Sequence, residues 1–267
     1  MTGNEPLVLR RDDGGVRTLT LNRPGARNAL SEGMIAALTA ELAEIARTPA
    51  VRVVVLAAAG PAFCAGHDLK ELRTKNDPAW TLALFEACSD LMLAITRLAQ
   101  PVIARVHGIA TAAGCQLVAT ADLAVAVSTA TFATPGVNIG LFCSTPMVAL
   151  SRNIGRKPAM EMLLTGRPIS ADEALRLGLV NRVVSAEALD GAVAELANAI
   201  LAKSPRVLSI GKRAFYEQAD KPLAEAYAYT SAVMAKNMLE PDAHEGIDAF
   251  LAKRAPVWRG ETIVTDP

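Results

Sequence analysis

Two glycine-containing turns carry the residues of this sequence that could do chemistry. They occupy residues 63–72, FCAGHDLKEL, and residues 106–117, VHGIATAAGCQL. Each follows a run of apolar, largely β-branched residues expected to form a strand, and each leads into a segment expected to begin a helix. Backbone N–H groups at such a turn have no intrahelical acceptor and can point at a developing negative charge. Because two amide donors from separate turns can form an oxyanion hole, the pattern predicts a site that stabilises an anionic intermediate.

The elements that must position these turns alternate between strand and helix along the first part of the chain. The patterns predict strands at 7–11, 16–21, 51–57, 102–106 and 122–127, and helices at 31–47, from 68 onward, at 80–98 and at 113–120. Past about residue 200 only helical patterns follow, at 204–218, 222–237 and 242–253. We therefore predict an α/β core over residues 1–200 and a helical C-terminal region over residues 201–267.

The composition argues against several other classes of protein. The 27 basic and 27 acidic residues of the 267-residue chain cancel, and aromatic residues make up only 4%, which disfavours a nucleic-acid partner. The four cysteines lack metal-site spacing, so we expect reduced thiols, no metal and a cytoplasmic location. The polar start, residues 1–6, has no apolar signal core, and no run approaches the roughly 18 apolar residues of a membrane span.

Seven motifs, in a fixed order along the chain, carry a family resemblance. They occupy residues 21–30, 63–72, 106–122, 132–141, 164–174, 178–184 and 250–254. Together they resemble the enoyl-CoA hydratase/isomerase (crotonase) superfamily, and residues 66–72, 112–117 and 132–146 resemble its enoyl-CoA hydratase domain-containing protein 3 subgroup. The resemblance implies a crotonase-type spiral of ββα units whose helical C-terminal region builds a homotrimer or a dimer of trimers. It also implies a lyase of fatty acid metabolism that needs no separate cofactor, because coenzyme A enters within the acyl-CoA thioester.

The resemblance places the two oxyanion donors at the backbone N–H groups of His67 and Ala113. The alternative is that both segments are merely tight turns. The imidazole of His67 could act as a general acid or base. It could also simply hydrogen-bond within a loop near the coenzyme, and we favour this second role.

The acid groups of the family's hydratases are absent from this sequence. Their two glutamates fall on Gln116 and Gly136, and the aspartate of dienoyl isomerases falls on Ser144. Gln116 can hydrogen-bond but cannot exchange a proton at neutral pH, and Gly136 has no side chain. Because each acid or base contributes about 10²–10⁴ in rate, ordinary hydration is expected to be weak or absent. An enzyme with another reaction and a noncatalytic acyl-CoA-binding or scaffolding protein both remain open.

A nearby cysteine could supply different chemistry. Cys143 lies close to the position of the missing second glutamate and is conceivable as a nucleophile. The more economical interpretation is a small buried apolar side chain, because no histidine is placed beside it by the sequence.

Residues that hold the coenzyme are implied by the resemblance alone. Backbone near the first oxyanion turn would hold the adenine and pantetheine, at Arg23, Gly25, Ala26 and Ala65. Asp68 belongs to the same set and is also expected to cap the following helix. Lys253 matches a basic position that approaches a coenzyme phosphate from a neighbouring subunit; the alternative for it is a solvated helix charge.

Overall fold

A computed structural model describes residues 5–260 of the chain, and its strands form two sheets. The six-stranded sheet has the order β1 (Val8–Asp13), β2 (Val16–Leu21), β3 (Val53–Ala58), β5 (Val102–Val106), β7 (Leu123–Val127) and β10 (Arg182–Val184). Its first pair is an antiparallel hairpin and its other neighbours are parallel. The four-stranded sheet has the order β4 (Ala62–Cys64), β6 (Ile109–Thr111), β8 (Thr131–Ala133) and β9 (Ile169–Ser170).

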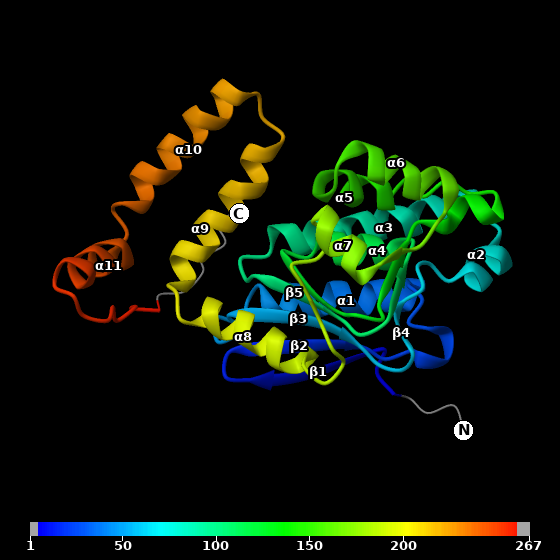
Figure 1. The fold of residues 1–267 in the computed structure, drawn as a ribbon, viewed down its shortest axis with the longest axis horizontal. Coiled ribbons are helices and arrows are strands. Elements are labelled where there is room, and N and C mark those ends of the chain that lie inside the picture. Colours follow the sequence, from blue (N-terminus) through cyan, green and yellow to red (C-terminus); the bar gives the residue numbers. More distant parts are fainter. Residues whose placement is uncertain (1–4, 261–267) are drawn as a thin grey trace.

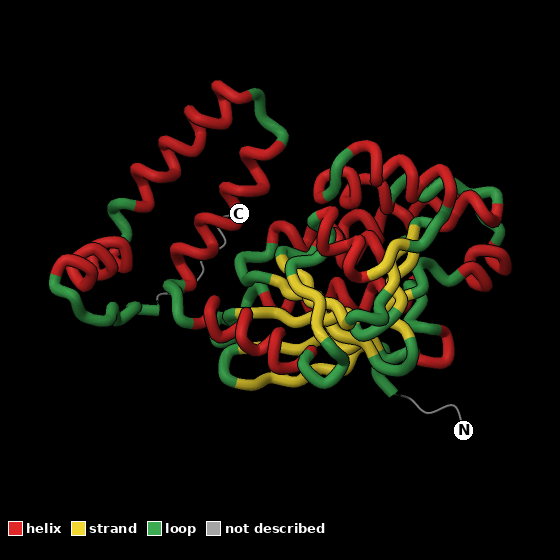
Figure 2. The backbone as a smooth tube through the Cα atoms, viewed as in Figure 1, coloured by secondary structure: helices red, strands yellow, loops and turns green. Residues whose placement is uncertain are grey.

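The chain visits the two sheets in turn, which makes the spiral of ββα units that the family resemblance implies. The strand pairs β3–β4, β5–β6 and β7–β8 each place one strand in each sheet, and helices follow each pair. The helices of the core are α1 (Glu32–Ile45), α2 (Leu69–Lys75), α3 (Pro78–Arg97), α4 (Ala113–Thr120), α5 (Pro146–Asn153), α6 (Arg156–Thr165), α7 (Ala171–Leu177) and α8 (Leu189–Leu201). In Figure 1 the helices α3 to α7 lie above the strands, and Figure 2 shows all strands in this half of the molecule.

Helix α3 is the one helix of the described residues that is long and apolar enough to cross a membrane. Length and composition alone do not distinguish such a helix from the core helix of a globular domain. Helix α3 packs against α1, and one of its faces is buried in the core through Leu84, Cys88, Leu91, Met92 and Ile95. Burial of this face accounts for only part of its apolar composition, because Leu82 and Leu93 of the same helix are exposed.

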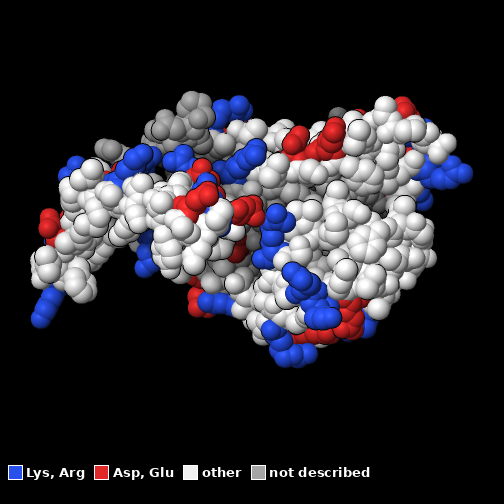
Figure 3. All heavy atoms as spheres, turned by 90° about the horizontal axis from the view of Figure 1, so that it is seen from above, with Lys and Arg blue, Asp and Glu red and all other residues white. Residues whose placement is uncertain are grey.

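The C-terminal helices form an arm beside the core (Figures 1 and 2). They are α9 (Pro205–Ala219), α10 (Leu223–Asn237) and α11 (Pro241–Leu251). Lys212 of α9 docks the arm, since its ammonium donates to the Asp122 carboxylate at 2.6 Å and to the Ile95 and Gln100 carbonyls at 3.0 Å each. Tyr216 donates to the other Asp122 oxygen at 2.8 Å. Figure 3 shows the molecule from above, with acidic and basic side chains interspersed over the face that is seen.

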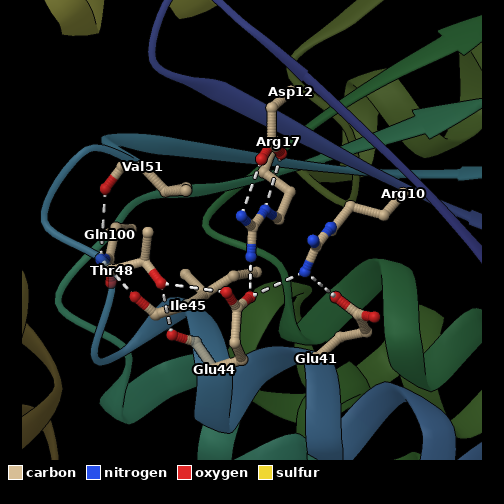
Figure 4. A network of polar contacts seen from close by, with 9 residues as sticks. All are labelled: Arg10, Asp12, Arg17, Glu41, Glu44, Ile45, Thr48, Val51 and Gln100. Carbon is tan, nitrogen blue, oxygen red and sulfur yellow. Dashed lines mark hydrogen bonds and ion pairs between the residues drawn. The ribbon is translucent and has the colours of Figure 1, made fainter.

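A polar network holds the N-terminal hairpin on helix α1 (Figure 4). Arg17 is 3% exposed and donates two hydrogen bonds of 2.7 Å to the Asp12 carboxylate, and it also pairs with Glu44 of α1. Arg10 reaches the same Glu44 carboxylate at 3.3 Å. A buried Gln100 amide closes the C-terminal end of α1 by donating to the Ile45 carbonyl at 3.1 Å. Charge-assisted bidentate hydrogen bonds hold their partners in a defined orientation. The hairpin and α1 therefore form one unit.

The predicted division near residue 200 falls at the end of α8. The division into a core and a C-terminal region stays a prediction. Residues 1–4 of the predicted core and residues 261–267 of the predicted C-terminal region lie outside the described residues.

Candidate functional site

The pairing of β4 with β6 brings the two glycine turns into contact. These strands run parallel, with Ala62 opposite Ile109 and Cys64 opposite Ala110. Gly66 has a φ of +89°, and a Cβ on it would lie 2.8 Å from the Ala112 Cβ and 3.3 Å from the Ala113 nitrogen. Only glycine fits this backbone conformation at this separation, so the first turn closes directly onto the second.

The backbone N–H of His67 points away from Leu30, the residue with which His67 forms a bridge. Leu30 and His67 form an isolated parallel bridge, in which the Leu30 N–H donates to the Gly66 carbonyl at 2.8 Å and the Asp68 N–H donates to the Leu30 carbonyl at 3.2 Å. Successive N–H groups of an extended segment point to opposite sides. The His67 N–H therefore faces the side opposite Leu30 and is used by neither of these bonds.

The amide of Ala113 is held by an unusual backbone conformation. Ala113 is the first residue of α4, so its N–H belongs to the first turn, where helix amides lack intrahelical acceptors. The preceding Ala112 has φ 50° and ψ −120°, a region that favours glycine. Its own N–H donates to the Ala133 carbonyl at 2.9 Å, and its carbonyl accepts from Gln116 at 3.0 Å. Backbone strain of this kind costs of order 1–3 kcal/mol and concentrates at functional sites.

The imidazole of His67 packs edge-on against Phe85 of α3, with ring centroids 4.8 Å apart. Its Nε2 atom is buried and has no hydrogen-bond partner among the described residues. Burial lowers the pKa of His67 to about 4, so the ring is neutral at pH 7. A neutral ring offers one donor and one acceptor but little capacity to donate a proton to a substrate.

The two positions of the expected glutamates lie in closed surroundings. Gln116 on α4 is 4% exposed, and its Oε1 atom has no partner among the described residues. Gly136 is buried in the 3₁₀ turn Pro135–Ile139. A Cβ on it would lie 2.7 Å from the Leu141 carbonyl oxygen and 3.0 Å from the Cys143 sulfur. The chain itself occupies the space that a side chain at residue 136 would enter.

Cys143 and Ser144 differ in their surroundings although they are adjacent. Cys143 is buried, and burial raises the pKa of its thiol, which keeps the reactive thiolate scarce at pH 7. Ser144 is exposed, and its hydroxyl donates to the nearby Phe142 carbonyl at 3.4 Å. Neither side chain is poised as a nucleophile or base among the described residues.

Asp68 joins the first turn to the loop before α1. Its carboxylate caps α2 by accepting from the Lys70 and Glu71 amides at 3.0 and 3.2 Å, and it pairs with the Arg23 guanidinium at 2.6 Å. Burial opposes ionisation, but the bonds from Arg23 and these amides outweigh it and hold the pKa of Asp68 below its usual range. Arg23 precedes the 3₁₀ turn Pro24–Ala26, which contains the predicted Gly25 and Ala26.

A hollow of about 520 Å³ opens beside this ion pair. Three cations and two carboxylates contribute to its wall, which is lined by Arg23, Ser31, Gly33, Asp68, Lys70, Glu71, Thr74 and Lys75. Arg23 and Asp68 were expected at the site from the sequence, whereas Lys70 and Lys75 were not. Their position on the helix that Asp68 caps was a signal that could have identified them.

Of the remaining predicted coenzyme residues, Ala65 lies where the two turns meet and Lys253 lies far from them. The Ala65 N–H donates to the Arg27 carbonyl at 3.0 Å, and its carbonyl accepts from the Thr111 hydroxyl at 3.1 Å. Lys253 follows α11, which lies at the end of the molecule opposite α2 in Figure 1. Lys253 is thus brought together with none of the other predicted residues of its own chain. Among residues 5–260, no group of three or more histidine, cysteine, aspartate or glutamate side chains could hold a metal ion.

Comparisons with known proteins identify the family of the chain. The family model described as enoyl-CoA hydratase/isomerase matches residues 11–261. The chain belongs to this family. Human enoyl-CoA hydratase domain-containing protein 3, mitochondrial, is 47% identical over 258 residues, which cover 97% of this chain and 85% of the relative.

Two solved structures of the family have nearly the same fold. An enoyl-CoA hydratase of Mycobacterium smegmatis superimposes with a TM-score of 0.93 at 58% identity, over 95% of this chain and 99% of the other. The human enoyl-CoA hydratase domain-containing protein 3 superimposes with a TM-score of 0.92 at 46% identity, over 94% and 100%. The predicted family, its subgroup and the crotonase-type fold are confirmed.

The predicted cytoplasmic location is wrong by the same comparison. The rat, mouse, zebrafish and human relatives are all named mitochondrial. The prediction came from the polar first residues and reduced cysteines, features that a protein of the mitochondrial interior can share.

Proposed function

We propose that this enoyl-CoA hydratase-like protein binds acyl-CoA thioesters and polarises the thioester carbonyl with the N–H groups of His67 and Ala113. The contact of Gly66 with the start of α4 supports this proposal more than any other observation. The two turns that would supply the amide donors meet at this contact. A thioester oxygen accepts hydrogen bonds weakly and an enolate oxygen strongly, so such a pair favours reactions that pass through an enolate.

The hollow beside Arg23 suits the phosphate groups of the acyl-CoA. Coenzyme A carries several negatively charged phosphate groups, and Arg23, Lys70 and Lys75 give the hollow an excess of one positive charge over Asp68 and Glu71. Arginine and lysine side chains at its wall would hold the phosphates while the thioester reaches the two turns. Lys253 would add a charge only from a neighbouring copy, because its own arm extends away from α2.

Ordinary hydration is not the reaction that these residues favour. Hydration needs one group that activates water and one that delivers a proton. Gln116 does neither, and residue 136 has no side chain. A noncatalytic acyl-CoA-binding or scaffolding protein is therefore the second candidate, and the neutral state of His67 favours it, since the imidazole at the first turn is also a poor acid.

Self-association into a trimer or a dimer of trimers belongs to the same proposal. The arm exposes a stripe of apolar side chains along α10, with Leu223 75%, Tyr227 67% and Met234 57% exposed. In oligomers, exposed apolar stripes of this kind are buried at the interfaces between subunits. Light scattering at micromolar concentration should show three or six copies, and a stable monomer would contradict it.

The test of the proposed function is a panel of acyl-CoA thioesters of increasing chain length. Purified full-length protein is titrated by calorimetry against each thioester and against free coenzyme A, and the same mixtures are followed by mass spectrometry for turnover. We expect thioesters to bind more tightly than the free thiol. If thioesters and free coenzyme A bind with equal affinity, the two turns do not contact the thioester carbonyl. If neither binds, the proposed function is rejected.

A further inference from the structure

A side-chain hydrogen bond from Thr111 of β6 joins the two glycine turns. Its hydroxyl donates to the Ala65 carbonyl at 3.1 Å. Ala65 precedes His67 by two residues, and Thr111 precedes Ala113 by two residues. The bond therefore lies equally close along the chain to each of the two residues whose amides are assigned to the thioester carbonyl.

This bond lies where the pairing of the two strands ends. Strands β4 and β6 pair irregularly, with a register shift between Ala62 and Cys64, and their last paired residues are Cys64 and Ala110. Ala65 and Thr111 directly follow that last pair. The Thr111 hydroxyl thus continues the connection between the two segments at the point where the strand pairing stops.

The segment that follows Thr111 has a strained backbone. Ala112 has a φ of 50°, a conformation that favours glycine. A Cβ on Gly66 would lie 3.1 Å from the Thr111 carbonyl oxygen and 3.3 Å from the Ala113 nitrogen, so the first turn is packed against this segment. Strained backbone persists only where the surrounding contacts over-determine it. The Thr111 hydroxyl supplies one such contact, directly beside the strained residue.

We propose that Thr111 is a positioning residue, which fixes the separation of the His67 and Ala113 amides so that both can reach one thioester oxygen. This inference rests on the proposed function, which assigns those amides to the thioester carbonyl. An oxyanion donor must lie about 2.7–3.1 Å from its oxygen, and hydrogen bonds weaken steeply when their geometry departs from the ideal. A hydroxyl that holds one turn against the other therefore affects the bound thioester without touching it.

The position of Thr111 separates this effect from the binding of the coenzyme phosphates. Thr111 does not contribute to the wall of the hollow beside Arg23. Free coenzyme A has no thioester carbonyl, so its affinity should not depend on the separation of the two amides. The ratio of the thioester affinity to the affinity of free coenzyme A therefore isolates the role of Thr111.

The test uses Thr111→Val, which keeps the shape of the side chain and removes the hydroxyl. Calorimetry with butyryl-CoA and free coenzyme A measures the preference for the thioester. Infrared difference spectra of butyryl-CoA, isotopically labelled at its carbonyl carbon, measure the polarisation of the bound carbonyl. We expect the thioester preference to fall about 3- to 10-fold, the range that one net hydrogen bond supplies. The carbonyl stretch should move from its bound towards its unbound frequency, because a misplaced donor polarises the carbonyl less.

Two further variants separate positioning from a general loss of stability. Thr111→Ser keeps a hydroxyl and should keep the thioester preference and the carbonyl stretch of the parent protein. Thr120→Val is the matched control, because the Thr120 hydroxyl also donates to a backbone carbonyl, that of Gln116 at 2.8 Å, but donor and acceptor both belong to α4. It should leave the preference and the stretch unchanged even if it lowers the Tm.

The inference is overturned if Thr111→Val keeps the preference and the stretch of the parent, or if Thr120→Val loses them to the same extent. It is also overturned, without any variant, if a crystal structure of the parent with butyryl-CoA shows the Thr111 hydroxyl beyond hydrogen-bond distance from the Ala65 carbonyl. Failure of both ligands to bind, or a parent protein with no thioester preference, would instead reject the proposed function, so the failures are distinguishable.

Discussion

The substitution Gly136→Ala probes directly whether the chain has closed the position of the second glutamate. A Cβ at residue 136 would lie 2.7 Å from the Leu141 carbonyl oxygen and 3.0 Å from the Cys143 sulfur. The first of these is backbone, and the Leu141 N–H is itself bonded to the Gly136 carbonyl at 2.9 Å. The loop therefore cannot give way by rotating a flexible side chain.

The expected magnitude follows from two opposing effects. Overpacking of this kind typically costs about 1–3 kcal/mol. Replacing glycine by alanine also restricts the unfolded chain, which stabilises the protein by about 0.4–1 kcal/mol. With mid-range values for both effects, the net destabilisation is about 1.3 kcal/mol. Since 1 kcal/mol lowers Tm by about 2–4 °C at this size, the Tm should fall by roughly 3–5 °C.

The assay is thermal unfolding, with a matched glycine as control. Gly191 lies in α8, and a Cβ on it would meet nothing within 4 Å, so Gly191→Ala should raise stability by about 0.5–1 kcal/mol. If Gly136→Ala unfolds at or above the Tm of the parent, the loop is not closed over this position. In that case crowding by the loop does not explain why the glutamate is absent.

Three other outcomes are expected. The parent protein should hydrate crotonyl-CoA far below the roughly 10 per second of ordinary enzymes, because its site lacks an acid pair; a spectrophotometric rate near that value would refute this. His67→Ala should keep thioester binding, whereas Ala113→Pro removes a backbone donor and should weaken it. If the Ala113→Pro variant folds and calorimetry gives it the same thioester affinity as the parent, Ala113 is not an oxyanion donor. Lys212→Met removes the cation that binds Asp122 and two carbonyls, so it should lower the free energy of unfolding by about 3–5 kcal/mol, measured by chemical denaturation. A decrease below about 1 kcal/mol would show that other contacts hold the arm on the core.

The sequence by itself determined the elements whose signals are local. Ser31 and Asp68 are capping residues recognisable from their neighbours, and both cap helices in the structure. The strand at 102–106 and the helix at 113–120 have the predicted bounds, because each is a continuous run of suitable residues. The family resemblance likewise depended only on the order of motifs along the chain.

The second sheet was not predictable in this way. Strands β4, β6, β8 and β9 have three residues or fewer each, too short to show a period of two. They exist because tertiary pairing satisfies their backbone groups, and that pairing is what joins the two glycine turns.

Only the tertiary structure decided the character of the site. The approach of Gly66 to Ala113, the loop over Gly136 and the unpartnered carboxamide oxygen of Gln116 all depend on contacts between segments distant in sequence. The residue types at these positions show what each group can do. Whether a group is buried, engaged or free depends on which distant segment packs against it, and a pattern of neighbouring residues carries no record of that packing.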